Sequence, residues 1–210
     1  PSWYDADCHK VHPREVQNFV TASGDDFAVT MSSSVAAFDW VNPFNAQDSQ
    51  VIFQPILLAS RKSCHPQGSM YSQPGDHEFA FSFTTHKPGW HHGWKTGIQA
   101  NQPLTVMVDV TRQSQAALPA ELSFLHTAAD NIMITAVKKC EDDKYLILRF
   151  VEMEGRDSHA DFTFQTPLKT AIRTNLIEEV MPGENECPKE DGRFTAPIGH
   201  HAIETYKLFY

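Results

Sequence analysis

The stretch HEFAFSFTTH, residues 77–86, limits most strongly what this chain can fold into. Phe79, Phe81 and Phe83 occupy every second position of it. The positions between and beside them are acidic, small or hydroxylated: Glu78, Ala80, Ser82 and Thr84. Successive side chains of a β-strand point to opposite faces of a sheet, so an apolar residue at every second position marks one face. The stretch therefore predicts a half-buried strand.

Strand-like segments recur along the chain. They are residues 27–40, 51–60, 104–110, 131–139, 144–152, 159–164, 170–179 and 201–210. Turn-forming sequences such as SQPGD, EDDK and EMEGRDS separate most of them. The best helix candidate, residues 112–122, is interrupted by Pro119. Many short strands without alternating helices predict an all-β, antiparallel sandwich, and residues 112–122 are the expected boundary between two β units.

Composition and charge narrow the class of protein. Of 210 residues, 41% are hydrophobic and 20% are charged, which predicts a packed core rather than disorder. The formal net charge of −9 disfavours binding to nucleic acid or to an anionic membrane surface. No apolar run approaches the roughly 20 residues that a membrane-spanning helix needs. We therefore expect neither a nucleic-acid partner nor a membrane partner.

The ends and the cysteines say less. The chain opens at Pro1 without an initiator Met or a signal-peptide pattern, which we interpret as an internal piece of a longer protein. Cys8, Cys64, Cys140 and Cys187 are widely spaced and form no C-x-x-C pair, so a zinc ribbon is disfavoured. Their disulfide status and the cellular compartment stay open.

A segment rich in Trp and His follows the alternating strand. Residues 86–94 read HKPGWHHGW, and we call residues 86–95 the Trp/His loop. Three interpretations compete: a metal site, a loop whose indoles pack on the sheet, and a sugar contact that uses flat aromatic faces and polar side chains. The spacing fits no zinc pattern, and Gly89 and Gly93 would let a ligand approach the backbone closely. Composition alone leaves packing as the first interpretation.

The remaining polar clusters point to no active site. Asp142-Asp143, Glu152/Glu154 and Glu178-Glu179 fall in expected turns or strand ends, where carboxylates are usually solvated. Residues 32–34, three consecutive serines, have no activating base nearby and suggest a strand surface. The sequence contains no G-x-S-x-G, H-E-x-x-H or Gly-rich phosphate loop. We predict no catalytic residue in this chain.

Several motifs in a fixed order resemble a known family. Residues 123–164 read SFLHTAADNIMITAVKKCEDDKYLILRFVEMEGRDSHADFTF, and TNLIEE (174–179) and HAIETYKLFY (201–210) follow. They resemble the carboxy-terminal region of glycoside hydrolase family 38, the α-mannosidases. The family's patterns A-[LV]-K-K, L-R-[LF]-x-E-x-x-G and T-[ND]-L-x-E, and its last strand, correspond to Ala136–Lys139, Leu148–Gly155, Thr174–Glu178 and Glu204–Leu208. GDHEFAFSFTTH (75–86) and NQPL (101–104) extend the similarity into the first half.

This resemblance implies a fold and a domain division. Residues 1–118 would be the end of a galactose-mutarotase-like β-supersandwich, and residues 119–210 a small terminal β-sandwich. Such enzymes are much longer, and their amino-terminal catalytic domain carries the zinc and the Asp nucleophile that hydrolyse terminal α-mannosides with retention. The resemblance places the family's zinc-binding motif, an H-x-D of the amino-terminal domain, outside this chain, and it predicts that the isolated chain is inactive and holds no metal.

The resemblance also suggests a role for the Trp/His loop. The family carries a long loop between the Phe79–Phe83 strand and NQPL, in a position that can project toward the catalytic domain. We expect the loop to line the mannose site or to dock onto the missing amino-terminal domain, through the following residues: Trp90, His91, His92, Trp94 and Lys95. The expected partners are that domain and a mannose-containing carbohydrate.

Two other function classes stay open from the sequence. One is a free-standing carbohydrate-binding β-sandwich protein without hydrolase activity. The other is an enzyme complete in itself with mutarotase-like chemistry, which would need a His/Glu acid–base set facing one cleft.

Overall fold

The computed structural model describes residues 14–35, 37–40, 51–58, 61–62, 70–108, 119–183, 186–187, 189–190 and 192–210. The chain divides into two compact units, residues 1–108 and 109–210. The boundary predicted between residues 118 and 119 adjoins residues 109–118, which lie outside the described residues, so the predicted domain limits stay a prediction. Much of the predicted helix 112–122 lies there as well, and its described part, residues 119–122, is not helical.

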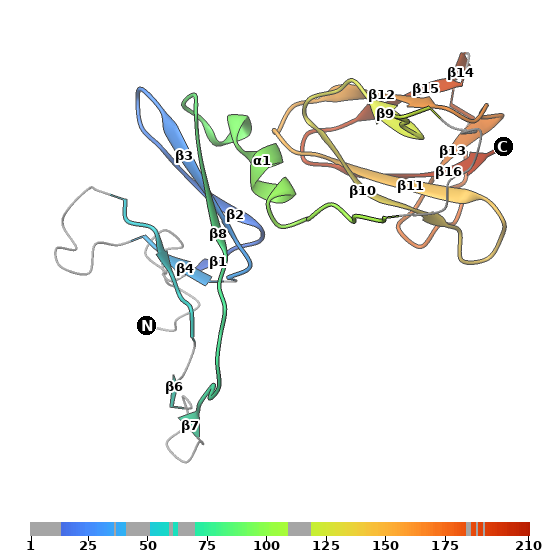
Figure 1. The fold of residues 1–210 in the computed structure, drawn as a ribbon. Coiled ribbons are helices and arrows are strands. Elements are labelled where there is room, and N and C mark those ends of the chain that lie inside the picture. Colours follow the sequence, from blue (N-terminus) through green and yellow to red (C-terminus); the bar gives the residue numbers. More distant parts are fainter. Residues whose placement is uncertain are drawn as a thin grey trace, which may run out of the picture. The chain divides into compact units, whose positions relative to one another are not determined.

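Unit 1 contains small antiparallel sheets. The largest has the order β2-β3-β8, from β2 (Phe19–Ser23), β3 (Ala28–Ser33) and β8 (Phe81–His86). A second sheet has the order β1-β4-β5, from β1 (Arg14–Glu15), β4 (Ala37–Asp39) and β5 (Gln54–Pro55). A third pairs β6 (Arg61–Lys62) with β7 (Met70–Tyr71). Figure 1 shows β3 beside β8, with the helix α1 (Trp94–Gln99) next to this sheet.

The two faces of the β2-β3-β8 sheet differ in polarity. Residues paired across antiparallel strands share a face, so the register Thr21↔Thr30↔Thr84 defines one hydroxyl-bearing face. The register Val20↔Met31↔Phe83 defines the opposite, apolar face. The predicted alternation of β8 is thus present, although the strand begins at Phe81 rather than at His77. The prediction of a half-buried strand was wrong for its Phe face, because Phe81 and Phe83 are exposed in this structure.

Three predictions in unit 1 were wrong in part. Residues 104–108, expected as a strand, have no regular structure. The Trp/His loop continues into the short helix α1, which the sequence did not predict. Of the three serines expected on a strand surface, Ser32 and Ser33 are buried, and the Ser33 hydroxyl accepts a hydrogen bond from the Val35 amide.

Unit 2 is a sandwich of two four-stranded antiparallel sheets. One has the order β10-β11-β16-β13, from β10 (Ile132–Lys139), β11 (Leu146–Glu152), β16 (Ile203–Phe209) and β13 (Thr170–Thr174). The other has the order β14-β15-β12-β9, from β14 (Lys189–Glu190), β15 (Arg193–Ile198), β12 (Ser158–Phe164) and β9 (Leu125–Thr127). Figure 1 shows the two sheets lying face to face. The all-β prediction is confirmed.

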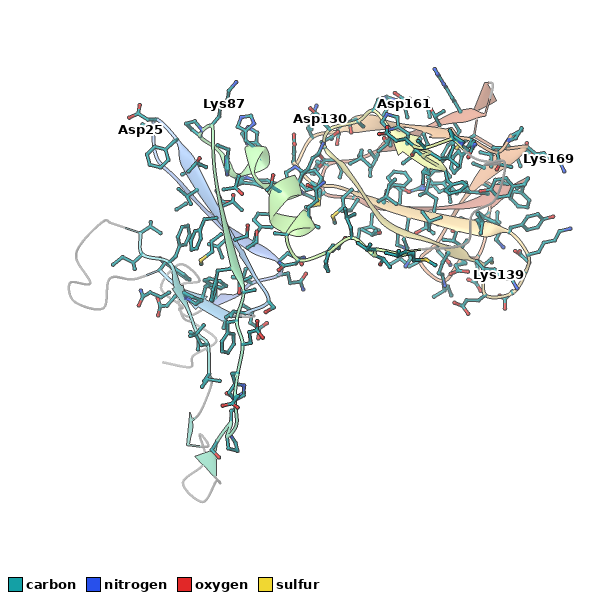
Figure 2. All side chains as sticks on the ribbon, viewed as in Figure 1. Asp25, Lys87, Asp130, Lys139, Asp161 and Lys169 are labelled. Carbon is teal, nitrogen blue, oxygen red and sulfur yellow. The ribbon has the colours of Figure 1, made fainter. Side chains whose placement is uncertain are left out.

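Aromatic side chains from both sheets fill the interior of unit 2. Phe150 of β11 stacks on Tyr206 of β16 with ring centroids 5.8 Å apart, and Phe162 of β12 stacks on Phe194 of β15 at 5.2 Å. All four are at most 1% exposed. Figure 2 shows side chains filling the space between the sheets, as expected when alternate residues of each strand point inward.

Strand β15 was missed in the sequence because it contains Pro197, which normally marks an edge or a break. Pro197 pairs with His159 of β12 on one side. On its other side β14 pairs only with Arg193 and Phe194, so among the described residues no ladder partner lies beside Pro197 there. The missing proline N–H therefore leaves the sheet intact at this point.

None of the helices in the described part of the chain has the length and apolarity needed to span a bilayer.

Candidate functional site

The Trp/His loop folds into two short helical turns. After β8, the chain passes through Gly89 into the 3₁₀ helix η3 (Trp90–His92), and Gly93 then leads into α1. Gly89 has φ 98°, a backbone conformation that residues with a Cβ rarely adopt. The Gly93 amide donates to the Trp90 carbonyl at 2.9 Å and closes the first turn. Local hydrogen bonds thus shape a segment that the sequence identified only as a loop.

His86 fixes the start of this loop on the sheet. Its Nδ1 lies 2.8 Å from the Lys87 carbonyl oxygen, and its Nε2 lies 2.8 Å from the Thr30 hydroxyl. A carbonyl oxygen only accepts, so in the neutral imidazole Nδ1 carries the proton and Nε2 accepts from Thr30. The Thr21 hydroxyl, 2.7 Å from that of Thr30, then donates to it. This chain of hydrogen bonds joins β2, β3 and the first residues of the loop.

Glycines let the loop pack closely on the hydroxyl-bearing face of the sheet. A Cβ on Gly93 would lie 2.2 Å from the Thr30 Oγ1 and 2.3 Å from the His86 Nε2. A Cβ on Gly97 would lie 2.6 Å from Cγ of Phe19. The sequence suggested that Gly93 opens the backbone to a ligand, but this residue is buried. Its backbone instead approaches the side chains of the sheet.

The predicted site residues divide into a buried one and an exposed group. Trp94 is 4% exposed and serves internal packing, with Lys95 Nζ 5.4 Å from its ring centroid. Trp90 is 41% exposed, and His91, His92 and Lys95 are exposed as well. The rings of His91 and His92 lie 4.1 Å apart, and that of Trp90 meets His91 edge-on at 6.5 Å. The loop therefore presents one indole and two imidazoles to its surroundings.

This exposed group can contact a ligand or a protein but lacks the parts of an active site. An indole face can stack on the C–H face of a sugar, and imidazoles can hydrogen-bond hydroxyls. No carboxylate lies within the loop sequence to act with the histidines as an acid–base pair. No group of three or more His, Cys, Asp or Glu side chains in the described residues could hold a metal ion, so these residues do not fit a zinc site.

In unit 2, the buried carboxylate of Glu152 holds several loops together. Glu152 is only 1% exposed. Its oxygens accept hydrogen bonds from the amides of Glu154, Gly155 and His201 at 2.7–3.0 Å and from the Asn131 side-chain amide at 2.8 Å. Burial alone would raise the pKa of Glu152, but these donors outweigh it and hold the pKa at about 2. The expectation that Glu152 is a solvated surface residue was wrong.

Glu178 forms a second internal anchor. The Lys138 ammonium lies 2.7 Å from one oxygen, and the Glu141 amide donates to the other at 2.9 Å. The Lys138 bond first, and the Glu141 amide second, lower the pKa of Glu178 to about 2. Glu178 also has φ 71°, which is strained for a residue with a side chain. The expectation of a solvated surface residue was wrong for Glu178 too, because Glu178 is only 7% exposed.

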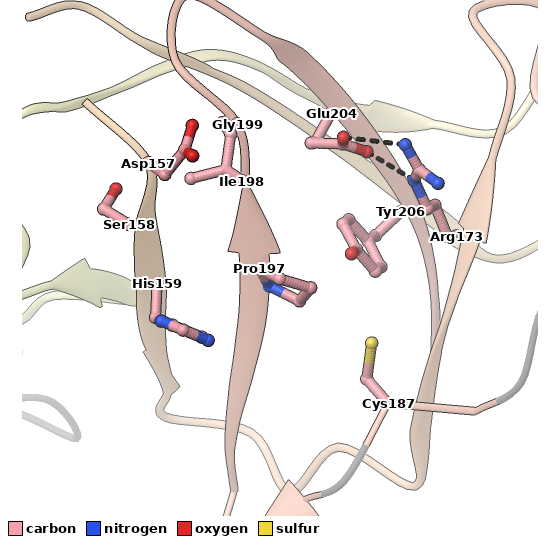
Figure 3. Close-up of a pocket in the computed structure, with 10 residues that line it drawn as sticks. All are labelled: Asp157, Ser158, His159, Arg173, Cys187, Pro197, Ile198, Gly199, Glu204 and Tyr206. Carbon is pink, nitrogen blue, oxygen red and sulfur yellow. Dashed lines mark hydrogen bonds and ion pairs between the residues drawn. The ribbon is translucent and has the colours of Figure 1, made fainter. Parts of the chain in front are cut away.

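A hollow of about 580 Å³ opens between β12 and β15 on one side and β13 and β16 on the other. Figure 3 shows Arg173 paired with Glu204, above Tyr206 and Cys187. The Arg173 Nε and Nη2 atoms donate to the two Glu204 oxygens at 2.6 and 2.8 Å. Burial raises the pKa of the Tyr206 hydroxyl above its usual value. The guanidinium and the carboxylate neutralise each other, so neither is set up as a catalytic acid or base. No local sequence pattern marks this hollow, because its lining comes from four separate strands and the segments beside them.

The family comparison agrees with this architecture. Residues 131–206 match the model described as "Glycosyl hydrolases family 38 C-terminal beta sandwich domain". This match confirms the resemblance to glycoside hydrolase family 38. It runs from β10 into β16, and it contains Glu152 and Glu178, which are acidic positions of two of the quoted family 38 motifs. In this structure both are internal anchors of the sandwich.

Solved structures establish the fold over nearly the whole chain. An alpha-mannosidase from Enterococcus faecalis V583 matches with a TM-score of 0.62 and 18% identity, over 95% of this chain and 21% of that one. A protein in the glycosyl hydrolase family 38 from Enterococcus faecalis matches with a TM-score of 0.62 and 19% identity, over 96% of this chain and 23% of that one. The chain thus spans less than a quarter of the length of these proteins. No curated protein matches its sequence.

Proposed function

We propose that this chain is the non-catalytic carboxy-terminal β region of a longer, retaining α-mannosidase. The observation that carries the proposal is the match of residues 131–206 to the family 38 β-sandwich domain, because this domain is described as the C-terminal domain of family 38 proteins. The likeness of almost the whole chain to about a fifth of an alpha-mannosidase supports it. Hydrolysis of terminal α-mannosides, with any zinc that it needs, would then be carried out by residues outside this chain.

The proposal gives unit 2 a structural task. Its buried carboxylates bind backbone amides and a lysine, and these contacts stabilise a fixed shape rather than a reacting group. A rigid terminal sandwich can support neighbouring domains, and rigid supports are what precise catalytic sites need.

Unit 1 is proposed to take part in the sugar site or in docking to the catalytic domain, through the exposed members of the Trp/His loop. The exposed side chains are available for such a contact: Trp90, His91, His92 and Lys95. Trp94 is buried and packs inside unit 1. The hydrogen bonds of His86 fix the start of the loop to Thr30 of β3, and such a restraint lowers the entropic cost of forming the contact.

Kinetics of the complete polypeptide that contains this chain would test the proposal. Trp90→Ala and His91→Ala should each lower kcat/KM for an aryl α-mannoside about tenfold, which corresponds to roughly 1.4 kcal/mol of transition-state stabilisation. Asp142→Asn, a change at an exposed turn of unit 2, is the matched control and should leave the kinetics unchanged.

Two results would count against the proposal. Unchanged kcat/KM in both loop variants would remove the loop from the site. A complete polypeptide that lacks α-mannosidase activity but binds mannose-containing glycans through the 210-residue chain alone would favour the free-standing carbohydrate-binding protein instead.

A further inference from the structure

The hollow of unit 2 lies beside β15, beyond the end of the short strand β14. This strand pairs with β15 only at Arg193 and Phe194, so among the described residues no ladder partner continues beside Pro197. A longer neighbour of β15 would occupy the space there. That space is instead the hollow of about 580 Å³, a size common among small-molecule sites, and the ten residues that line it all belong to the described part of the chain.

The floor of the hollow is apolar and holds one buried charge. Tyr206 and Ile198 are buried and supply the apolar part. The Glu204 side chain is only 9% exposed, and its carboxylate accepts both hydrogen bonds from Arg173 (Figure 3). A buried carboxylate is costly unless it is paired in this way. The ion pair is therefore held in one place, without net charge, against an apolar surface.

The walls of the hollow reach the solvent and carry polar groups. The Arg173 side chain is 41% exposed, so a molecule that enters the hollow can meet it. Asp157 and His159, at the start of β12 and just before it, are exposed on the other side. Pro197, which pairs with His159, adds a rigid apolar ring. Hydrogen-bonding groups thus lie on two sides of an apolar surface.

The charges of the lining disfavour several classes of ligand. Two acidic residues, Asp157 and Glu204, accompany one basic residue, Arg173, so the lining does not attract an anion. The described residues contain no group of three or more metal-ligating side chains, so a ligand held through a cation is disfavoured too. A wholly apolar molecule would take water away from the ion pair and give it no hydrogen bond in exchange. A small neutral molecule with several hydrogen-bonding groups fits best.

A sugar ring has this chemistry. Each hydroxyl can both donate and accept, so one hydroxyl can donate to the Glu204 carboxylate while its neighbour accepts from the Arg173 guanidinium. Hydrogen bonds to charged groups are stronger than those between neutral groups. The C–H face of the same ring can pack on the Pro197 ring, which removes apolar surface from water.

We propose that this hollow binds one neutral sugar ring. Arg173 and Glu204 bind adjacent hydroxyls, and His159 binds a further hydroxyl at the rim. Pro197 contacts the C–H face of the ring. The inference goes beyond the proposed function, because a sugar can bind here whether or not the complete polypeptide hydrolyses mannosides.

The thiol of Cys187 reports whether the hollow is occupied. Cys187 lines the hollow and is partly exposed, whereas Cys140 is buried. The 210-residue chain would be treated with iodoacetamide with and without methyl α-D-mannopyranoside, and the alkylation rate of Cys187 would be measured by peptide mass spectrometry. A bound sugar covers the thiol, so sugar at ten times its dissociation constant should slow this alkylation about tenfold. The alkylation of Cys140 is the internal control and should not respond to the sugar.

Two variants and a matched control assign the effect to the hollow. Glu204→Gln should abolish the protection of Cys187 by the sugar. His159→Ala changes an exposed residue and should raise the sugar concentration for half protection about threefold to tenfold, the loss expected for one hydrogen bond. His126→Ala changes an exposed histidine of β9, in the same sheet but outside the hollow, and should leave the protection unchanged. Circular dichroism checks that each variant is folded.

Several results would overturn the inference. Protection by sodium acetate but not by the sugar would show an anion site. Equal protection by cyclohexanol, whose ring carries a single hydroxyl, would show that apolar contact alone is responsible. A sugar that gives no protection at any concentration, or one whose protection survives in both Glu204→Gln and His159→Ala, does not bind in the hollow as proposed. α-Mannosidase activity is measured on the complete polypeptide, so failure of this test leaves the proposed function standing.

Discussion

Replacement of Glu152 by Gln should destabilise unit 2 strongly at neutral pH and much less in acid. The residue is 1% exposed, and its carboxylate accepts hydrogen bonds from five backbone or side-chain N–H donors. Gln removes the charge and turns an NH₂ group toward some of these donors. The pKa of Glu152 is about 2, against an ordinary value of 4.5, and at about 1.36 kcal/mol per pH unit this depression stabilises the folded state by about 3 kcal/mol at pH 7.

The sign of the pH dependence follows from the lowered pKa. The folded state binds this proton more weakly than the unfolded state does, so the stabilisation is fully present above the ordinary pKa of 4.5. It is lost as the pH falls toward 2. The free-energy difference between wild type and Glu152→Gln should therefore be about 2 kcal/mol smaller at pH 3 than at pH 7.

Urea unfolding followed by far-UV circular dichroism measures this difference. All four tryptophans, at positions 3, 40, 90 and 94, lie in unit 1, so tryptophan fluorescence reports separately on that unit and should not change. The melting temperature of unit 2 should fall on the order of 10–20 °C at pH 7. Glu121→Gln, at an exposed position, is the control. A variant within about 0.5 kcal/mol of wild type at pH 7, or a difference that is the same at both pH values, would refute the reasoning.

Three further predictions concern the loop and the second carboxylate. Trp94→Ala should lower the free energy of unfolding, measured in urea, by about 3–5 kcal/mol. Trp90→Ala, at a 41% exposed residue, should lower it clearly less, and equal losses would show that both indoles belong to the core. Gly93→Ala should lower the melting temperature of unit 1, followed by tryptophan fluorescence, because its Cβ has no room beside the sheet; an unchanged midpoint would contradict this packing. Lys138→Met should destabilise unit 2 at pH 7 more than at pH 3, because it raises the lowered pKa of Glu178; a destabilisation that does not vary with pH would show that the ion pair does not set that pKa.

The sequence predicted the sandwich well because its core strands carry their own signal. The alternating segments that became β10, β11, β12 and β16 were identified within two residues at each end. β15 was not predicted because Pro197 normally argues against a strand. The proline is tolerated here because the neighbouring strand β14 is too short to pair with it. A strand can thus be predicted from its own sequence, whereas whether it tolerates a proline depends on the neighbouring strand.

The site was less predictable because its geometry comes from residues far apart in the chain. The donors to Glu152 include the amide of His201, 49 residues away, so no local pattern marks this carboxylate as buried. The helical turns of the Trp/His loop depend on the close contact of the Gly93 backbone with Thr30 of β3, which is distant in the sequence. The sequence did identify the loop as a candidate contact, but it could not tell the supporting Trp94 from the exposed Trp90.

The most direct test of the central claim is the hydrolysis of an aryl α-mannoside by two purified proteins at equal concentration: the 210-residue chain and the complete polypeptide that contains it. The account predicts turnover by the complete polypeptide and none by the chain. Turnover by the pure chain, or a complete polypeptide that hydrolyses no α-mannoside, would contradict it.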